Sequence, residues 1–402
     1  MQIRKLASSN LQPSGSTRRL VRFVSVGTAA CMLFSTAPAL AASAAESSPA
    51  TTTRSLPAPG LFGSQDPTYN GVFRQSLAIL ALKAAGAHVN QQATAWLLAQ
   101  QCTDGSFVAF RESVSVPCGQ PDANNYSGPD SNSTAIAAAA LAVSGKRANA
   151  RSAIRWLVTR QNSDGGFAYY PAPGSTSDAN STGLVALALS ALGRKPAKTR
   201  VGSGSSVMDY LHTVQQSCDV TGDGRAAMRF TAGPESSTNN LASAQAGLGL
   251  TPLVRGNGRI ASVTKPAGKL RPAVPVFVCP KPRHIAQTTT RNALLGYLAR
   301  TMLANGGAIP DTFSPGKADV GSTAASIISL ATAGFGRAAV RQGVGVLRLN
   351  ASTYLQSNGP FGLADDAGSL ANYILVAKAT KKNPRTMFGT NLIARLNATR
   401  QA

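Results

Sequence analysis

Histidine is scarce in this chain, and its cysteines are not spaced for metal binding. Of 402 residues only three are histidines, His88, His212 and His284, and none of the five cysteines belongs to a Cys-x-x-Cys pair. Zinc sites are built from Cys and His ligands at such short spacings. We therefore expect no metal site and no required cofactor.

Long hydrophobic runs are also lacking. The apolar run Phe23–Phe34 is shorter than the ~20 residues that a membrane-spanning helix needs. It lies between five basic residues, the last of them Arg22, and the small-residue triplet Ala39–Ala41. This order is typical of a cleaved secretory signal peptide over residues 1–41, with a membrane anchor as the alternative. Thr17–Leu20 loosely resembles a twin-arginine motif, so both general and twin-arginine export stay open.

Acidic residues are few: 16 Asp and Glu stand against 39 Lys and Arg, for a formal net charge of +23. Only five of the basic residues lie in the predicted signal peptide, so the mature protein stays strongly basic. Such a charge suits an anionic cell-wall polymer or a membrane surface as a partner of a secreted or cell-surface protein. The basic residues are spread along the chain without an aromatic–basic cluster, so we expect no nucleic-acid partner.

The cysteines predict disulfides. Cys31 is lost with the signal peptide, and Cys102, Cys118, Cys218 and Cys279 remain. An even number of cysteines in an exported chain indicates two bridges. Three pairings are open, and we favour Cys102–Cys118 with Cys218–Cys279 because each closes a local loop. Free buried thiols are the alternative.

Two alternating sequence elements repeat after a Ser/Thr/Pro/Ala-rich stretch, residues 42–63, that is typical of a disordered linker. The first element, Trp96–Phe107, returns as Trp156–Phe167 with Gln, Asp-Gly and Phe in register. Degenerate copies begin at Tyr210, Tyr297 and Tyr354. Asp-Gly and Gly-Gly in these elements predict turns with positive φ.

The second element is a polar cluster followed by an Ala/Leu/Ile-rich run. Its copies are Asp130–Thr134, Asp178–Thr182, Asp319–Thr323, Asp366–Leu370 and the weaker Glu235–Asn239. Asp, Asn, Ser and Thr in this place cap helix starts. The runs after them are apolar all round and predict buried helices, whereas segments such as Ala150–Leu157 have one polar face. This alternation predicts an all-α fold, an α/α toroid with an inner and an outer ring of helices over residues 64–402.

These residues resemble the α/α-toroid repeats of squalene–hopene cyclases, protein prenyltransferase β-subunits and cobalamin carriers. Gln161 and Asp164–Phe167 are similar to the Gln-rich, glycine–aromatic repeat of the prenyltransferases and squalene cyclases. Tyr69–Leu82 is similar to the opening barrel helix of transcobalamin and intrinsic factor. The resemblance implies the toroid fold, whereas one fold hosts many activities.

The catalytic motifs that the resemblance implies are not intact. Where a squalene–hopene type cyclase has an Asp-x-Asp-Asp acid, this chain has Leu363-Ala364-Asp365-Asp366. Aromatic residues, which stabilise carbocations in such cavities, make up only 6% of the chain. No Asp-Asp-x-x-Asp motif for magnesium and diphosphate exists, and the three histidines are more typical of surface or structural positions than of the prenyltransferase zinc site.

We therefore expect an exported, non-catalytic and monomeric binding protein for a bulky small molecule, with a corrinoid as the best guess. The starts of the inner helices collect free backbone amides and polar caps around one mouth of the barrel. The candidate ligand-binding residues there, each of which has a purely capping role as its alternative, are Gln75, Asp130, Asn132, Thr134, Asp178, Asn180, Thr182, Asn239 and Asp319.

Two other functions stay open. One is a terpenoid cyclase-like or prenyltransferase-like enzyme with Asp365 or Asp366 as an unfamiliar acid. The other is a cell-surface interaction scaffold with an unused barrel. A Pro- and basic-rich insertion, residues 251–284, is expected as a loop over the mouth, pinned by Cys279.

Overall fold

The computed structural model describes residues 59–217, 224–233, 235–256, 258–261, 266–271, 287–360 and 362–402. The predicted signal peptide, most of the predicted linker, and Cys31, Cys218, Cys279 and His284 lie outside these residues. Within them, no helix is long and apolar enough to cross a membrane.

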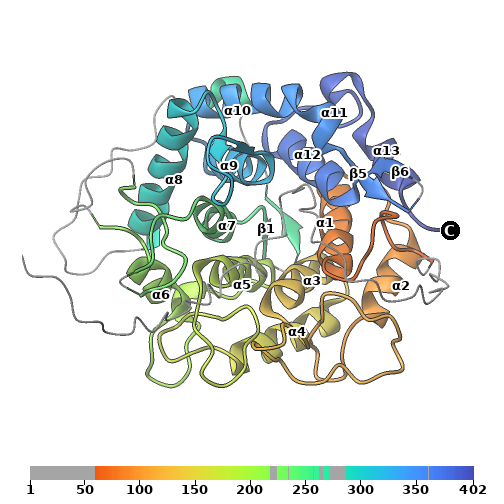
Figure 1. Cartoon of the computed structure of the whole chain (residues 1–402), viewed down its shortest axis with the longest axis vertical. Coiled ribbons are helices and arrows are strands. Elements are labelled where there is room, and N and C mark those ends of the chain that lie inside the picture. Colours follow the sequence, from red (N-terminus) through yellow and green to blue (C-terminus); the bar gives the residue numbers. More distant parts are fainter. Residues whose placement is uncertain are drawn as a thin grey trace, which may run out of the picture.

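Helices alternate between an inner and an outer ring, which confirms the predicted α/α toroid (Figure 1). In the described chain the inner ring consists of α1 (Gly71–Ala84), α3 (Ser131–Val143), α5 (Ala179–Ala191), α7 (Asn240–Leu250), α9 (Val320–Ala333) and α12 (Ala367–Ala379). Each packs against the next, and α12 packs against α1, so the ring is closed. Because inner helices contact protein on every side, their Ala- and Leu-rich sequences are buried all round.

The outer ring covers the inner one. It contains α2 (Gln91–Ala99), α4 (Arg147–Thr159), α6 (Val207–Thr213), α8 (Gln287–Ala304), α10 (Arg337–Leu349) and α13 (Leu392–Ala398), with the short α11 (Ala351–Tyr354) after α10. Helices of this ring bury one face only: α4 buries Trp156 and Leu157 while Arg151 and Arg155 stay exposed. This one-sided burial is what the alternating apolar and charged residues of the segment predict.

Short helices and strands fill the connections. The 3-10 helices are η1 (Pro196–Lys198), η2 (Ala267–Lys269) and η3 (Met387–Gly389). The strands of the described residues form three antiparallel pairs, β1 (Val254–Arg255) with β2 (Arg259–Ile260), β3 (Ile309–Pro310) with β4 (Ala318–Asp319), and β5 (Gln356–Gly359) with β6 (Gly362–Asp365). The last two pairs lead directly into α9 and α12, and so they position the starts of these inner helices.

The residues that recur in the first repeat element form hydrogen bonds that hold neighbouring repeats together. Gln161 donates from Nε2 to the carbonyl of Gly165 in its own exit turn and to that of Thr199 before the next outer helix. Phe167 then donates its backbone N–H to Thr182 Oγ1 of the inner helix α5 at 2.9 Å. The same bond joins Phe107 to Thr134 and Ile309 to Thr323. The repeat motif is therefore a structural connector between the rings.

The two ends of the described chain complete one repeat together. Gly60 donates its N–H to the Gln401 carbonyl at 3.1 Å, and Gln401 donates to the Leu61 carbonyl at 2.8 Å. Gly105 with Cys102, and Cys102 with Ser106, make the same pair of bonds inside a continuous repeat. Residues 60–62 thus supply the exit turn that follows α13. Leu61 and Phe62 are fully buried, so the folded domain begins before residue 64, where the sequence placed its start.

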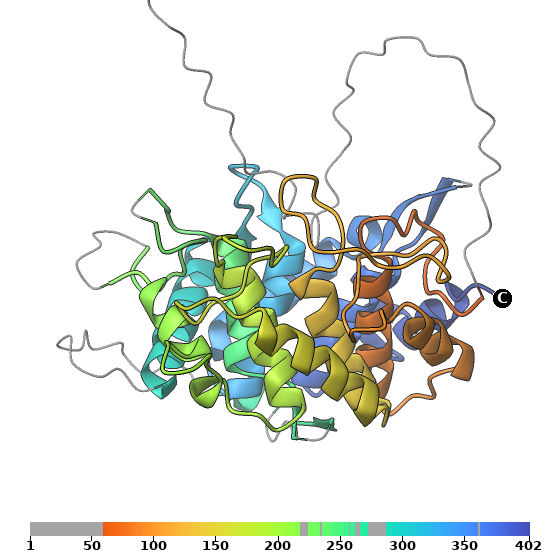
Figure 2. The same ribbon diagram turned by 90° about the horizontal axis from the view of Figure 1, so that it is seen from below.

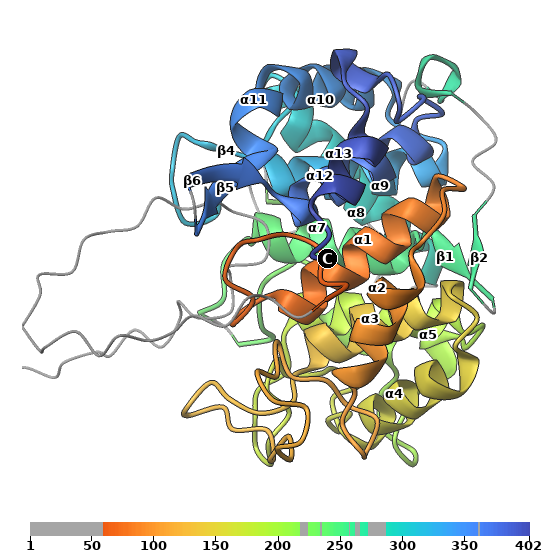
Figure 3. The same ribbon diagram turned by 90° about the vertical axis from the view of Figure 1, so that its right-hand side faces the viewer.

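The described part of the insertion, residues 251–256, 258–261 and 266–271, does not lie over the mouth where the inner helices begin, contrary to our expectation. Its β1–β2 hairpin lies against the opposite ends of these helices (Figures 2 and 3). Gly256 and Gly258 donate their N–H groups to the carbonyls of Ser190 and Ala191 at the end of α5. Helix ends expose carbonyls without partners, and the hairpin supplies donors for them.

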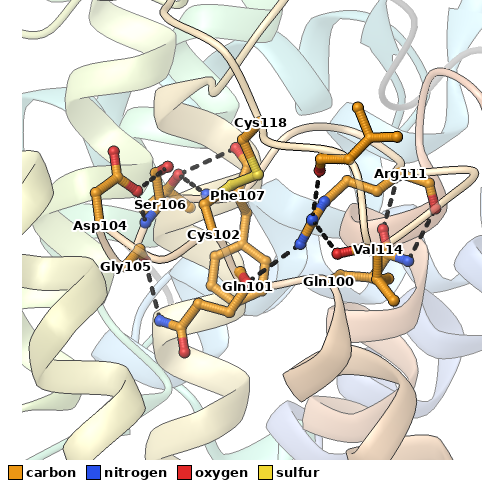
Figure 4. Close-up of a disulfide and its surroundings, with 12 residues drawn as sticks. Gln100, Gln101, Cys102, Asp104, Gly105, Ser106, Phe107, Arg111, Val114 and Cys118 are labelled. Carbon is orange, nitrogen blue, oxygen red and sulfur yellow. Dashed lines mark hydrogen bonds between the residues drawn. A yellow bond between two sulfur atoms is a disulfide. The ribbon is translucent and has the colours of Figure 1, made fainter.

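One predicted disulfide is present. Cys102 and Cys118 are bonded, with Cα atoms 5.9 Å apart (Figure 4). The bridge anchors the long loop that leads to α3. Arg111 strengthens this loop, because its guanidinium donates to the Val114 carbonyl at 2.6 Å and its backbone N–H donates to Gln100 Oε1 at 2.7 Å. The Cys218–Cys279 pairing stays a prediction, since both residues lie outside the described chain.

Candidate functional site

The inner helices all begin at one end of the barrel, beneath the loops that enter them (Figures 2 and 3). Five of the six inner helices in the described chain are capped by an Asp or Asn side chain that accepts a hydrogen bond from the backbone N–H three residues later; these caps are Asp130, Asp178, Asn239, Asp319 and Asp366. This confirms the capping role that the sequence predicts for them.

The helix starts are less open than we expected, because loops cover them. The Ser131 N–H of α3 donates to the Tyr169 carbonyl, and the Ala179 N–H of α5 donates to the Phe230 carbonyl, each at 2.8 Å. Val72 at the start of α1 bonds the Ala109 carbonyl in the same way. Each loop that leads into one inner helix thus accepts a hydrogen bond from a backbone amide at the start of the preceding inner helix. The mouth therefore does not present a ring of free amides.

Asn132 and Asn180 do meet at this end of the barrel. Asn132 Nδ2 donates to Asn180 Oδ1 at 3.3 Å, which joins α3 to α5. Thr134 and Thr182 point outward to the exit turns of Phe107 and Phe167. A residue two positions earlier on a helix points about 200° away, so the two asparagines face the barrel axis. Asn132 Oδ1 is buried and has no partner.

Asp130 and Asp178 are buried carboxyl groups beside this pair. Burial raises the pKa of each to about 7, against the opposing effect of hydrogen bonds from Ser133 and Ser181 respectively. A buried charge is poorly solvated, which favours the neutral acid. Asp178 uses both oxygens, because Oδ1 accepts from Ser181 N–H and Oδ2 from its hydroxyl. In Asp130, Oδ1 accepts from Ser133 N–H at 2.7 Å, whereas Oδ2 has no partner.

Two tyrosines complete the site, and our reading of the sequence missed them. Tyr169 and Tyr170 follow the exit turn of Phe167, and their rings pack edge to face with centroids 4.6 Å apart. Burial, and then the negative charge of Asp130, raises the pKa of Tyr169 well above its usual value and that of Tyr170 to about 12. Both rings therefore belong to the surroundings of Asp130. An adjacent aromatic pair between the two repeat elements was the signal that could have identified them.

The other predicted ligand-binding residues have structural partners. Gln75 accepts from the Phe62 N–H and donates to the carbonyls of Gly60 and Ala93, so its amide holds α1 to α2 and the N-terminal segment. Thr134 and Thr182 are used by the exit turns described above.

Asn239 and Asp319 start α7 and α9, on the other side of the ring from α3. Asp319 accepts from both the N–H and the hydroxyl of Ser322, and burial raises its pKa. Neither residue is brought to the Asn132–Asn180 pair by a bond that the structure shows.

Asp365 and Asp366, the candidate acids of a cyclase-like enzyme, form structural hydrogen bonds. Asp365 accepts from Arg395 through both oxygens, at 2.7 and 2.9 Å, and Asp366 caps α12 and accepts from the Ser357 hydroxyl. Both oxygens of each carboxyl thus already accept a hydrogen bond from another residue of the protein. In the described residues, no group of three or more His, Cys, Asp or Glu is placed to hold a metal ion.

One family model and two solved structures are similar to parts of this chain. Residues 31–228, just under half of the chain, match the family model described as prenyltransferase alpha-alpha toroid domain. A crystal structure of a protein from Actinoplanes is 16% identical over 80% of this chain and 92% of its own, with a TM-score of 0.45. A type II terpene cyclase from Scytonema, in complex with its product merosterolic acid A, is 14% identical over 76% of this chain and 87% of its own, with a TM-score of 0.43.

Among curated proteins, none matches this sequence. None of the matches found supports the resemblance of residues 69–82 to cobalamin carriers. The first half of the chain is similar in sequence to the prenyltransferase α/α-toroid family, and the chain folds as an α/α toroid.

Proposed function

We propose that this protein is an enzyme of the terpenoid cyclase type, in which Asp130 protonates an isoprenoid substrate at the mouth of the barrel. The observation that carries the proposal is the state of Asp130: a fully buried carboxyl with a pKa of about 7 and one oxygen without a partner. An acid that is partly protonated near neutral pH can act as a proton donor.

The local geometry suits both protonation states of Asp130. In the neutral acid, the proton resides on the unpartnered Oδ2 and Oδ1 remains bonded to Ser133 N–H. When Oδ2 gives its proton to an alkene or epoxide, the resulting carboxylate stays at the start of α3, where backbone amides and the helix dipole stabilise a negative charge. A base that removes a proton from the final cation restores a neutral product. The net reaction is then an isomerisation, and it needs no co-reactant.

The surroundings of Asp130 suit an apolar, cationic intermediate. The rings of Tyr169 and Tyr170 lie near the carboxyl, and aromatic rings stabilise cations. The sequence lacks the Asp-Asp-x-x-Asp motif that metal-dependent diphosphate ionisation uses, which favours protonation as the starting step. A non-catalytic carrier would use the same residues, and a corrinoid has no support as its ligand. Secretion and a cell-surface partner stay predictions.

Deuterium incorporation tests the proposal. We would incubate the purified protein with squalene and with farnesol in D₂O and search for cyclic products by gas chromatography and mass spectrometry. We expect a product that carries deuterium, and a loss of rate of at least ~100-fold in Asp130→Asn, which keeps the cap but cannot donate a proton. Asp209→Asn, in the capping box of the outer helix α6, is the matched control and should keep the rate. Full activity of Asp130→Asn, or no cyclic product from either substrate, would overturn the proposal.

A further inference from the structure

Gln245 is a fully buried amide with nothing to bind. It lies on the inner helix α7, none of its surface is exposed, and neither Oε1 nor Nε2 has a hydrogen-bond partner. Buried side-chain amides in folded proteins are almost always satisfied by protein, water or ligand, because an unpaired group loses its bonds to water without replacement.

The contacts of α7 show which way Gln245 points. Asn240 and Ser243 face outward, since Asn240 bonds the Pro310 carbonyl and Ser243 Oγ accepts from the Met228 N–H. Ala246 lies close to Gly183 and so faces α5. Gln245 is about 200° around the helix from Ser243, which places its side chain toward the barrel axis.

A few side chains that point toward the axis keep a little accessible surface. Leu77, Leu187 and Leu375 point inward, and 7%, 8% and 9% of their surfaces stay accessible. Leucines that point outward from the same helices, Leu82 and Leu189, have no accessible surface. A probe the size of a water molecule therefore still touches the inward leucines, whereas Gln245 itself has no accessible surface.

Gln245 lies deeper in the barrel than the site at the mouth. Asn132 is two residues past the cap of its helix, and Gln245 is six residues past Asn239. At 1.5 Å per residue, Gln245 is about 6 Å further along the axis. A molecule that enters from the mouth would meet Asp130 and Asn132 first and Gln245 afterwards.

We infer that Gln245 binds a hydroxyl group of the substrate inside the barrel, so that the substrate is an isoprenoid alcohol and not a plain hydrocarbon. This inference rests on the proposed function, because it places the alkene at Asp130 and the hydroxyl at the far end. A hydroxyl both donates and accepts, which matches an amide whose Oε1 and Nε2 are both unoccupied. A hydrocarbon would leave both atoms unpaired.

The test compares two ligands of the same carbon skeleton, one with a hydroxyl group and one without. Binding of farnesol and of farnesene, the hydrocarbon of the same skeleton, is measured by equilibrium dialysis against wild type, Gln245→Leu and Ser326→Ala. We expect Gln245→Leu to weaken farnesol binding at least tenfold and to leave farnesene binding unchanged or tighter. Ser326, which is also fully buried with an unpartnered hydroxyl, lies on α9 and is the control; its variant should bind both ligands as wild type does.

The outcomes separate this inference from the proposed function. Equal effects of Gln245→Leu on both ligands, or no binding of farnesol by wild type, would overturn the inference. Selective loss of farnesol binding without any turnover would uphold the hydroxyl site and reject the enzyme. Turnover that depends on Asp130 but is unchanged in Gln245→Leu would uphold the enzyme and reject the hydroxyl site. Gln245→Met provides the same comparison if the leucine variant fails to fold.

Discussion

Asp130 serves two purposes at one position, as the cap of α3 and as a buried acid. The cap requires only that one oxygen accepts from the Ser133 N–H, and it works in both protonation states. The acid requires that the rest of the carboxyl is kept from water, which the loop with Tyr169 achieves by bonding the next residue, Ser131. Asp178 has the same arrangement without the unoccupied oxygen.

The raised pKa values of Asp130 and Asp178 predict how stability depends on pH. Both are near 3.8 in the unfolded chain and about 7 in the fold, so the folded state binds more protons in between. Their contribution to stability is complete below pH ~4 and is lost as the pH rises through 7. The free energy of unfolding should fall by up to ~1.4 kcal/mol per pH unit for each carboxyl in this window. Urea unfolding at several pH values measures it.

The matched variants decide whether these two carboxyls are the cause. Asp130→Asn and Asp178→Asn keep the capping oxygen and remove the titration. Each should flatten the curve between pH 5 and 7, and the double variant should flatten it most. A double variant with the slope of wild type would contradict the assignment.

At the scale of the element, the exit turns depend on glycine for two separate reasons. Gly105, Gly165 and Gly307 occupy the same place in the exit turns of three repeats, and all have positive φ. A Cβ at Gly165 would also collide with the Ser206 carbonyl, at the start of the next outer helix. The corresponding residue of the third repeat is Ala226, which takes φ of 69° without being glycine.

Two glycine substitutions separate backbone strain from collision. Gly165→Ala introduces both backbone strain and a collision. Gly174→Ala introduces backbone strain alone, because Gly174 has φ of 78° and nothing lies near its Cβ position. The strain of a left-handed residue costs about 1–2 kcal/mol. We expect Gly174→Ala to lose about that much and Gly165→Ala at least ~2 kcal/mol more, measured by thermal unfolding. Equal losses of stability in the two variants would mean that the close contact between Gly165 and Ser206 does not matter for stability.

At the scale of the whole molecule, the ring is closed by hydrogen bonds between residues from its two ends. Residues 60–63 bond to Thr399 and Gln401, and Phe62 is fully buried there. Toroids and solenoids gain stability from contacts between neighbouring repeats, so an open ring leaves two unpaired faces. The N-terminal segment therefore contributes to the cooperativity of the entire fold, although it is only a few residues long.

Truncation tests the closure. A chain that begins at Pro59 should melt as the longer protein does, because every described contact is retained. A chain that begins at Ser64 loses the buried Phe62, a change of about 3–5 kcal/mol in a typical core, together with the bonds to Gln401. We expect a lower and broader melting transition in calorimetry. Indistinguishable transitions for the two chains would show that the ring does not need this segment.

Local features of this protein were determined by the sequence alone. The two alternating repeat elements predicted the paired rings of the toroid, because burial on all sides and burial on one side leave different patterns along a helix. The caps Asp130, Asp178 and Asp319 were predictable because each bonds an amide only three residues away. The Cys102–Cys118 bridge was predictable for the same reason, since it closes a short loop.

Tertiary structure decided what each polar side chain does once its own helix is formed. Gln75 and Thr182 looked like mouth residues, but their partners, Gly60 and Phe167, come from other parts of the repeat. The β1–β2 hairpin of the insertion binds the far end of α5, and Gln245 meets no hydrogen-bond partner. Both features depend on contacts between segments that are distant in sequence. Local hydrogen bonds follow from residue spacing, whereas burial, and with it the pKa of Asp130, is set by elements that fold against it from elsewhere in the chain.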